Sequence, residues 1–242
     1  MAEDRVVRKF DSDARDHKGY AYAGATARLS SRIANARITK VVLGAVTISG
    51  RKVIDVGCGD GTYTIELLQG SPRDILGIDP AASAIERARE SSAGRTGIRF
   101  AVASVYDLAS LGETFDVAVV RGVLHHLDRA SDAVAEIARV AREIVVVEPN
   151  GCNPALKVIE RVSSYHREHG EKSYPPGRLD RWFETAGGRV SGRWFIGLVP
   201  MFCPDWMARF LKLVEPGVER APIVRRIMCA QYIQRVEVQG KR

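Results

Sequence analysis

The chain has 242 residues, of which 45% are hydrophobic and 27% charged, a composition typical of a globular protein rather than a disordered or collagen-like one. Its 36 Lys and Arg residues exceed its 29 Asp and Glu residues, which gives a formal net charge of +7. The longest stretch without a charge, residues 194–204, is too short to span a membrane, and the N-terminus lacks the apolar core of a signal peptide.

The four cysteines stand far apart and form no Cys-x-x-Cys pair. Zinc ribbons and disulfide frameworks need cysteines at close, regular spacing, so the pattern argues against both. Unpaired cysteines are typical of a reducing compartment. We therefore expect a cytoplasmic protein, with any membrane contact limited to the membrane surface.

The positive charge is unevenly distributed along the chain. Residues 51–150 carry 11 basic and 15 acidic side chains, a net charge of −4, so the two flanks together supply +11. A basic surface favours anionic partners, including nucleic acids. The flanks are therefore where we expect such a partner to bind.

The chain begins with a polar segment and a helical pattern from Ala25 to Val46. Between residues 51 and 150, short apolar runs alternate with helical patterns. We expect strands at 52–56, 74–79, 98–102, 115–120 and 143–147, and helices at 62–68, 81–91 and 128–142. Continuous Val and Ile runs are typical of strands covered on both faces, so the pattern predicts a parallel sheet built of βαβ units.

The C-terminal flank begins with a Pro- and Gly-rich connection at 149–177. We expect its elements in this order: a short helix at 155–163, a helix at 179–186, a strand at 190–196, an amphipathic helix at 205–214 and a strand at 229–236. The helix at 205–214 places Trp206, Phe210 and Val214 on one face. We expect this face to pack on the core or to form a lid, with membrane contact through 194–214 or a dimer contact as the alternatives.

The strongest chemical signal follows the first expected strand, where glycines occupy positions 57, 59 and 61. Glycine permits a tight turn and lets a ligand approach the backbone closely. The Gly-x-Gly-x-Gly spacing differs from the Gly-x-Gly-x-x-Gly of dinucleotide-binding loops, which argues against an NAD-dependent enzyme. Asp55, inside the first strand, suits a cationic cofactor, and Asp79, at the end of the second strand, is placed to accept the hydroxyl groups of a ribose.

Three stretches resemble the successive motifs of class I S-adenosylmethionine-dependent methyltransferases, in particular the type 11-like set that acts on small molecules and lipids. They are VIDVGCGDGTYTIELL (53–68), ILGIDPAASAIERARE (75–90) and FDVAVVRGVLHHL (115–127). The resemblance implies a Rossmann-like α/β fold with a mostly parallel seven-stranded sheet flanked by helices. It also implies an amphipathic insertion before the last strand.

The same resemblance implies one methyltransferase domain over residues 1–242. Residues 1–50 would form an N-terminal helical cap, and residues 51–150 the cofactor-binding core. Residues 151–242 would supply the acceptor-side loop, the lid and the last strands.

The resemblance further implies the cofactor, S-adenosyl-L-methionine, and the residues that bind it. Gly57, Cys58 and Gly59 would face its methionine part, Asp55 would orient the ammonium group, and Asp79 would bind the ribose hydroxyls. The other expected contacts are Pro80 beside the adenine, Ser104 and Val105 near the adenine amino group, and Arg121 and Gly122 near the transferable methyl. Ser104 stands where the family often has an acidic residue, which changes one polar contact.

Histidines offer candidate groups on the acceptor side. His125, His126 and His166 are candidates for orienting the acceptor or for acting as a general base. The structural alternatives are support of the active-site floor for His125 and His126, and a solvated loop for His166. Adjacent histidines cannot both face one metal, and His166 and His169 lack further ligands, so we expect no metal site.

Methyl transfer needs little protein chemistry, because the sulfonium is already a good leaving group and the protein must only align the reactants and exclude water. We therefore expect in-line SN2 transfer to a small-molecule or lipid-like acceptor. The acceptor is expected to be anionic, because the flanks that would roof its site are basic. The sequence leaves open the identity of the acceptor, the atom methylated, the need for a base and the oligomeric state.

The sequence is also compatible with two other functions. An RNA methyltransferase would explain the net charge, but Arg121-Gly-Val-Leu follows the fourth strand in place of an Asn-Pro-Pro-Tyr motif, and we recognise no RNA-binding module. We therefore expect no nucleic-acid partner. A non-catalytic, regulatory S-adenosylmethionine-binding protein is the other alternative.

Overall fold

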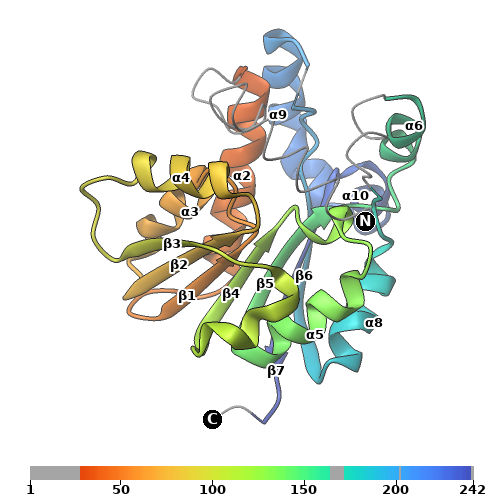
Figure 1. The fold of residues 1–242 in the computed structure, drawn as a ribbon. Coiled ribbons are helices and arrows are strands. Elements are labelled where there is room, and N and C mark those ends of the chain that lie inside the picture. Colours follow the sequence, from red (N-terminus) through yellow and green to blue (C-terminus); the bar gives the residue numbers. More distant parts are fainter. Residues whose placement is uncertain (1–27, 164–171, 202, 241–242) are drawn as a thin grey trace.

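The computed structural model describes residues 28–163, 172–201 and 203–240 (Figure 1). Its centre is a seven-stranded sheet in the order β3-β2-β1-β4-β5-β7-β6. The strands are β1 (Lys52–Val56), β2 (Asp74–Asp79), β3 (Ile98–Val102), β4 (Phe115–Arg121), β5 (Ala141–Pro149), β6 (Gly188–Ile196) and β7 (Gln231–Val238). Neighbours from β3 to β5 pair in parallel, whereas β7 is antiparallel to both β5 and β6. The mostly parallel, seven-stranded sheet expected from the resemblance is confirmed.

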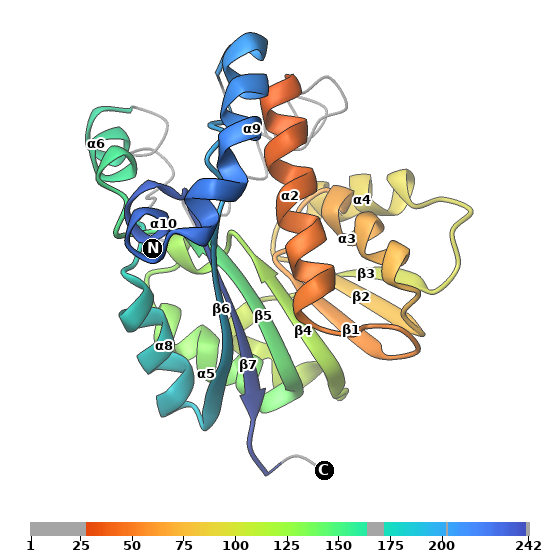
Figure 2. The ribbon, with the colours of Figure 1, turned by 180° about the vertical axis from the view of Figure 1, so that it is seen from behind.

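Helices cover both faces of this sheet. Helices α5 and α8 lie on the face that is in front in Figure 1, and α2 and α3 lie on the other face, which is in front in Figure 2. The helices are α2 (Leu29–Ala45), α3 (Thr62–Leu67), α4 (Ala82–Ser91), α5 (Ala130–Val140), α6 (Pro154–Val162), α8 (Pro176–Thr185), α9 (Asp205–Arg220) and α10 (Pro222–Met228). Three 3-10 helices complete the elements: η1 (Leu68–Gly70), η2 (Val105–Leu111) and η3 (Leu124–His126).

The two central strands explain why the sheet must be covered on both sides. Residues 117–120 of β4 and 144–147 of β5 are uninterrupted Val, Ile and Ala runs, and each side chain is at most 2% exposed. Because successive side chains point to opposite faces of a strand, these runs supply apolar surface to two separate cores. One core contains α5 and α8, and the other contains α2.

The parallel strands all end at the upper edge of the sheet in Figure 1, and α9 and the beginning of α2 project beyond that edge. The two helices lie side by side in both views. Nε of Arg37, on α2, donates to Oε1 of Glu219, on α9, at 3.2 Å. The Oγ of Ser30 donates to the carbonyl oxygen of Met201 at 3.0 Å, so the N-terminal and C-terminal flanks meet above the sheet.

Helix α9 differs from its expected form in length. The helical pattern predicts residues 205–214, but the helix continues to Arg220 and passes through Pro216. Inside a helix, proline removes one backbone hydrogen bond, so Pro216 favours an earlier end in the sequence pattern although the helix continues through it.

The expected packing of the α9 stripe is wrong. Trp206, Phe210 and Val214 are 71%, 59% and 39% exposed, so this face does not pack on the core. The packed face instead carries Ala208, which is fully buried, and Leu211, which is partly buried. Helical spacing identifies an apolar face, but it does not say what covers that face.

None of the helices within the described ranges is long and apolar enough to cross a membrane. All four cysteines lie within those ranges, and each is a free thiol.

Candidate active site

The glycine loop between β1 and α3 lies at the carboxyl edge of the sheet. The backbone N–H groups of Gly57 and Cys58 both donate to the carbonyl oxygen of Ile78, at 2.8 and 2.9 Å, which fastens the loop to the end of β2. Gly57 has a φ of +72°, and a Cβ there would lie 2.4 Å from Cγ2 of Val123. Glycine is needed both for the left-handed backbone and for the close approach of the segment after β4.

Asp79 stands at the tip of β2, between the glycine loop and the start of α4. Its Oδ2 accepts the backbone N–H of Gly59 at 3.0 Å, and its Oδ1 accepts that of Ala81 at 2.9 Å. These bonds fix the orientation of the carboxylate. A carboxylate has about four acceptor positions, so Asp79 can accept further hydroxyl groups without losing these two bonds.

Asp55 lies deeper, in the middle of β1, and is 4% exposed. Its Oδ2 accepts the hydroxyl of Thr64, on α3, at 2.6 Å. Burial raises the pKa of the Asp55 carboxyl to about 6, although the Thr64 bond and the nearby Arg121 guanidinium act in the opposite direction. Together with Tyr63, Arg121 and Thr39, Asp55 lines a narrow pocket between β1, α3 and α2.

Arg121, the last residue of β4, is the cation of this pocket. Its guanidinium lies 3.6 Å from the centroid of the Tyr63 ring. It donates from Nη1 to Oγ1 of Thr39 at 3.0 Å and from Nη2 to Oδ1 of Asn35 at 2.9 Å. Desolvation lowers the pKa of the guanidinium. The side chain therefore ties the end of β4 to both α2 and α3, while the next residue, Gly122, donates its N–H to the end of β5.

The other expected cofactor residues surround the same edge. Cys58 is 7% exposed, and burial raises the pKa of its thiol well above the usual value, so its backbone is the part that can serve a ligand. Ser104 is the N-cap residue before η2, and its hydroxyl accepts the Tyr106 N–H at 3.2 Å. Val105 is buried beneath that turn, and Pro80 is exposed after Asp79.

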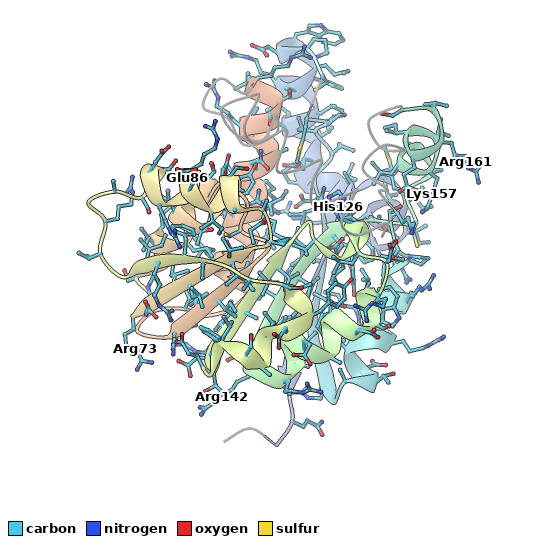
Figure 3. The ribbon with its side chains drawn as sticks, in the orientation of Figure 1. Arg73, Glu86, His126, Arg142, Lys157 and Arg161 are labelled. Carbon is cyan, nitrogen blue, oxygen red and sulfur yellow. The ribbon has the colours of Figure 1, made fainter. Side chains whose placement is uncertain are left out.

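The two adjacent histidines have different surroundings. His125 is 7% exposed, and its Nδ1 lies 2.7 Å from Oε2 of Glu148, at the end of β5. His126 is partly buried, and its ring centroid lies 3.9 Å from that of His125. Figure 3 labels His126 near the ends of the central strands. His166 lies outside the described residues.

The sequence analysis missed three residues of this edge, which are Asn35, Thr39 and Tyr63. Asn35 and Thr39 are polar side chains in a helix whose other buried residues are mainly apolar, and both are less than 9% exposed. A polar pair spaced by four residues on the core face of a helix is a signal that could have identified them. Tyr63 has no such local signal, whereas Glu148 could be placed at the mouth of the site from its position at the end of the fifth strand.

The residues present fit a cofactor that combines a ribose with a cationic group. The fixed carboxylate of Asp79 can accept ribose hydroxyls, and Asp55 supplies negative charge beside the glycine loop. Three of the five residues of the loop, Gly57, Gly59 and Gly61, have no side chain, so a ligand can approach its backbone closely. A pyrophosphate would instead meet two carboxylates, which disfavours a dinucleotide.

Comparison with known proteins identifies the core. Residues 53–143 match the family model described as a methyltransferase domain. The tRNA U34 carboxymethyltransferase of Campylobacter lari is 29% identical over 98 residues, which are 40% of this chain and 33% of that protein. An O-methyltransferase of Aspergillus sclerotiorum is 31% identical over 130 residues, 52% of this chain and 49% of that one. The chain thus spans a third to a half of the length of these relatives.

A solved structure extends the likeness to nearly the whole fold. The magnesium protoporphyrin IX methyltransferase of Synechocystis PCC 6803, with bound SAH, has a TM-score of 0.68. It is 15% identical and covers 97% of this chain and 98% of its own. At that identity the likeness shows the fold, while the family match shows the domain. Residues 53–143 therefore match a methyltransferase domain, and the described chain has the Rossmann-like fold of the solved methyltransferase.

Proposed function

We propose that the protein transfers a methyl group from S-adenosylmethionine to a small-molecule or lipid-like, anionic acceptor. The observation that carries the proposal is the placement of Asp79, whose carboxylate is held by Gly59 and Ala81 beside the glycine loop. When bound, the cofactor supplies an electrophilic methyl group on a sulfonium, so the chain must bind, align and exclude water. We place this activity in one functional unit spanning both flanks and the core.

The cofactor-binding roles follow from the edge described above. Gly57 to Gly59 would hold the methionine part, Asp55 would favour its ammonium group, and Asp79 would bind the ribose hydroxyls. Pro80, Ser104 and Val105 would surround the adenine. Arg121, at the end of β4, and Gly122, directly after it, would lie nearest the transferable methyl. The guanidinium of Arg121 donates to Asn35 and Thr39, so we assign Arg121 to holding α2 over the site.

The acceptor-side roles fall to the histidines. Because Glu148 holds the ring of His125, we propose that His125 positions the turn after β4. The more accessible His126 is the candidate for orienting the acceptor or removing its proton. His166 is kept as a candidate from the acceptor-side connection.

An RNA acceptor is the second candidate. It is favoured by the similarity to a tRNA U34 carboxymethyltransferase and by the basic flanks. We favour the small-molecule or lipid-like acceptor, because exposed cations of the C-terminal flank lie among exposed aliphatic side chains, which are poor partners for RNA. We also propose that the protein works at the membrane surface.

Calorimetry of the full chain with S-adenosylmethionine, its demethylated product and NAD tests the cofactor assignment. We expect binding of the first two and none of NAD. Asp79→Asn should lower the affinity roughly tenfold to a hundredfold, because it removes charged hydrogen bonds to the ribose. Asp74→Asn is the matched control, since Asp74 starts the same strand at the opposite edge and pairs with Arg99. Equal affinities for the two variants would refute the ribose assignment.

A further inference from the structure

We propose that the outer face of α9 and α10 docks the protein on an anionic lipid bilayer. The docking face consists of eight exposed apolar side chains: Trp206, Phe210, Leu213, Val214, Ile223, Val224, Ile227 and Met228. The proposal names a partner for the acceptor side of the proposed methyltransferase, but its evidence is independent of methyl transfer.

On each of the two helices the exposed apolar side chains follow helical spacing. Trp206, Phe210 and Leu213 are 71%, 59% and 80% exposed and follow each other by four and three residues, which places them on one side of α9. On α10, Ile223 and Ile227 are 76% and 47% exposed and are one turn apart. Large apolar side chains this exposed, at helical spacing on two neighbouring helices, mark an interaction surface rather than ordinary surface variation.

The inner side of α9 is already occupied. Ala208 is fully buried and packs with Val199 and Cys203, and Ile33 of α2 packs against the same cluster. The helix is therefore fixed to the protein by one face and presents the other outward. By contrast, Phe195 and Ile196, which belong to the apolar stretch 194–204, are 7% and 2% exposed and are part of the interior.

The acidic groups of this region face inward. Glu215 is 2% exposed and accepts the N–H of Leu198 at 3.1 Å, as well as the Lys212 ammonium at 2.6 Å. The Glu219 side chain is 10% exposed and pairs with Arg37 of α2. Within residues 205–228, the only exposed acidic residue is Asp205.

The cations of the same region face solvent. Arg209, Arg220 and Arg226 are all exposed, beside the docking face. Interfacial helices combine Trp, Phe and Leu on one side with Lys and Arg near the polar boundary, where the cations meet anionic headgroups. A second copy of the chain would bring cations against cations, and an RNA would leave the aliphatic side chains without contacts. The charge and the apolar content together favour the bilayer.

The docking face is connected to the carboxyl edge of the sheet, where the candidate active site lies. Nδ2 of Asn150, directly after β5, donates to the carbonyl oxygens of Arg226 and Cys229, both at 2.9 Å. Nδ2 of Asn153 donates to that of Met228 at 3.1 Å. These bonds fix the end of α10 to the carboxyl end of β5, so a docked protein would hold the acceptor side of the sheet close to the lipid headgroups.

Co-sedimentation of the full chain with vesicles tests the proposal. Vesicles of phosphatidylcholine alone are compared with vesicles that also contain phosphatidylglycerol, at low and at high salt. We expect binding to the anionic vesicles that weakens at high salt. The triple variant Trp206→Ser, Phe210→Ser, Leu213→Ser should bind roughly tenfold or more weakly. Val102→Ser is the matched control, because Val102 is an exposed apolar residue (53%) on β3, remote from the docking face.

The outcomes separate docking from methyl transfer and from other occupants. The triple variant should keep the wild-type affinity for S-adenosylmethionine in calorimetry, which shows that it is folded. The proposal is overturned if the wild-type chain does not sediment with anionic vesicles at low salt, or if the triple variant sediments equally well. It is also overturned if the variant instead abolishes a dimer in sedimentation velocity, or abolishes binding of a tRNA while vesicle binding persists.

Discussion

Nδ1 of His125 lies 2.7 Å from Oε2 of Glu148, and both side chains are buried. The same carboxylate accepts the backbone N–H groups of Val123 and Leu124 at 3.0 and 2.8 Å and that of His125 at 3.2 Å. A single side chain at the end of β5 thus determines the conformation of the turn after β4. Because an ionised carboxylate only accepts hydrogen bonds, we assign the Nδ1 proton to His125.

Replacing Glu148 by Ala should strongly destabilise the fold. The change leaves an imidazole N–H and three backbone N–H groups buried without this acceptor, so the free energy of unfolding should fall by about 3 kcal/mol. Urea unfolding followed by circular dichroism measures the loss. Glu184→Ala, on the exposed side of α8, is the control and should change the stability by less than about 0.5 kcal/mol. A Glu148→Ala variant as stable as this control would show that the carboxylate does not hold the turn.

Sequence reasoning succeeded where the determining information is local. The strands at 52–56 and 74–79 were predicted with the bounds that the structure shows, because each is a short apolar run bounded by turn residues. The glycine loop was equally predictable, because Gly57, Gly59 and Gly61 adopt positive φ angles that glycine accepts far more readily than other residues. Residues 115–120 were predicted one residue short of β4, which ends at Arg121.

The parts that could not be predicted depend on contacts between distant segments. Arg121 meets Asn35 and Thr39, which are 86 and 82 residues away in the sequence. Glu148 meets His125 through the pairing of β4 with β5, and no local pattern encodes that register. For α9, the period of the apolar residues was visible, but only the packing of α2 on its opposite side shows that the stripe stays exposed.

The contact of Arg121 with α2 predicts an energetic coupling. Arg121→Lys keeps the positive charge but loses the fork that reaches Asn35 and Thr39 together, so we expect a loss of about 2 kcal/mol in the free energy of unfolding. A double-mutant cycle with Asn35→Ala should then give a coupling energy of roughly 1 kcal/mol. Additive effects of the two substitutions would contradict the contact.

Arg121→Lys should also weaken cofactor binding, if α2 is held over the site as we propose. Calorimetry with S-adenosylmethionine measures this effect separately from stability. Arg129→Lys is a control from the opposite face of the sheet, because the exposed guanidinium of Arg129 contacts Asp132 and the Tyr106 ring rather than α2. Its affinity should equal that of the wild-type chain.

Gly57→Ala separates backbone strain from steric exclusion. Alanine at a φ of +72° costs roughly 1–2 kcal/mol, and its Cβ would in addition meet Val123 at 2.4 Å. Gly94→Ala has a similar φ of +79° but no atom within 4 Å, so it reports the backbone cost alone. We expect Gly57→Ala to lose about 2 kcal/mol more stability than Gly94→Ala, and to lose cofactor binding as well. Equal losses in thermal unfolding would show that Val123 yields to the new methyl group.

The buried carboxyl of Asp55 predicts a specific dependence of stability on pH. Its pKa is about 6 in the folded chain, against an ordinary value of 3.8. Between these two values, the folded chain holds the proton while the unfolded chain has released it. The contribution of Asp55 to the free energy of unfolding is therefore greatest below about pH 4. It declines by roughly 3 kcal/mol as the pH rises toward 6.

Asp55→Asn removes this titration while its amide oxygen can still accept the hydroxyl of Thr64. Compared with the wild-type chain, the variant should gain stability as the pH rises from 4 to 6, and the difference should level off above that range. Urea unfolding of both proteins at half-unit pH intervals, without cofactor, measures the difference. A constant difference in the free energy of unfolding between the two proteins from pH 4 to 7 would mean that burial does not raise the pKa of the Asp55 carboxyl. The expected curve, combined with a loss of S-adenosylmethionine binding in the same variant, would show that the charge at Asp55 is kept for the ligand at a cost to the ligand-free fold.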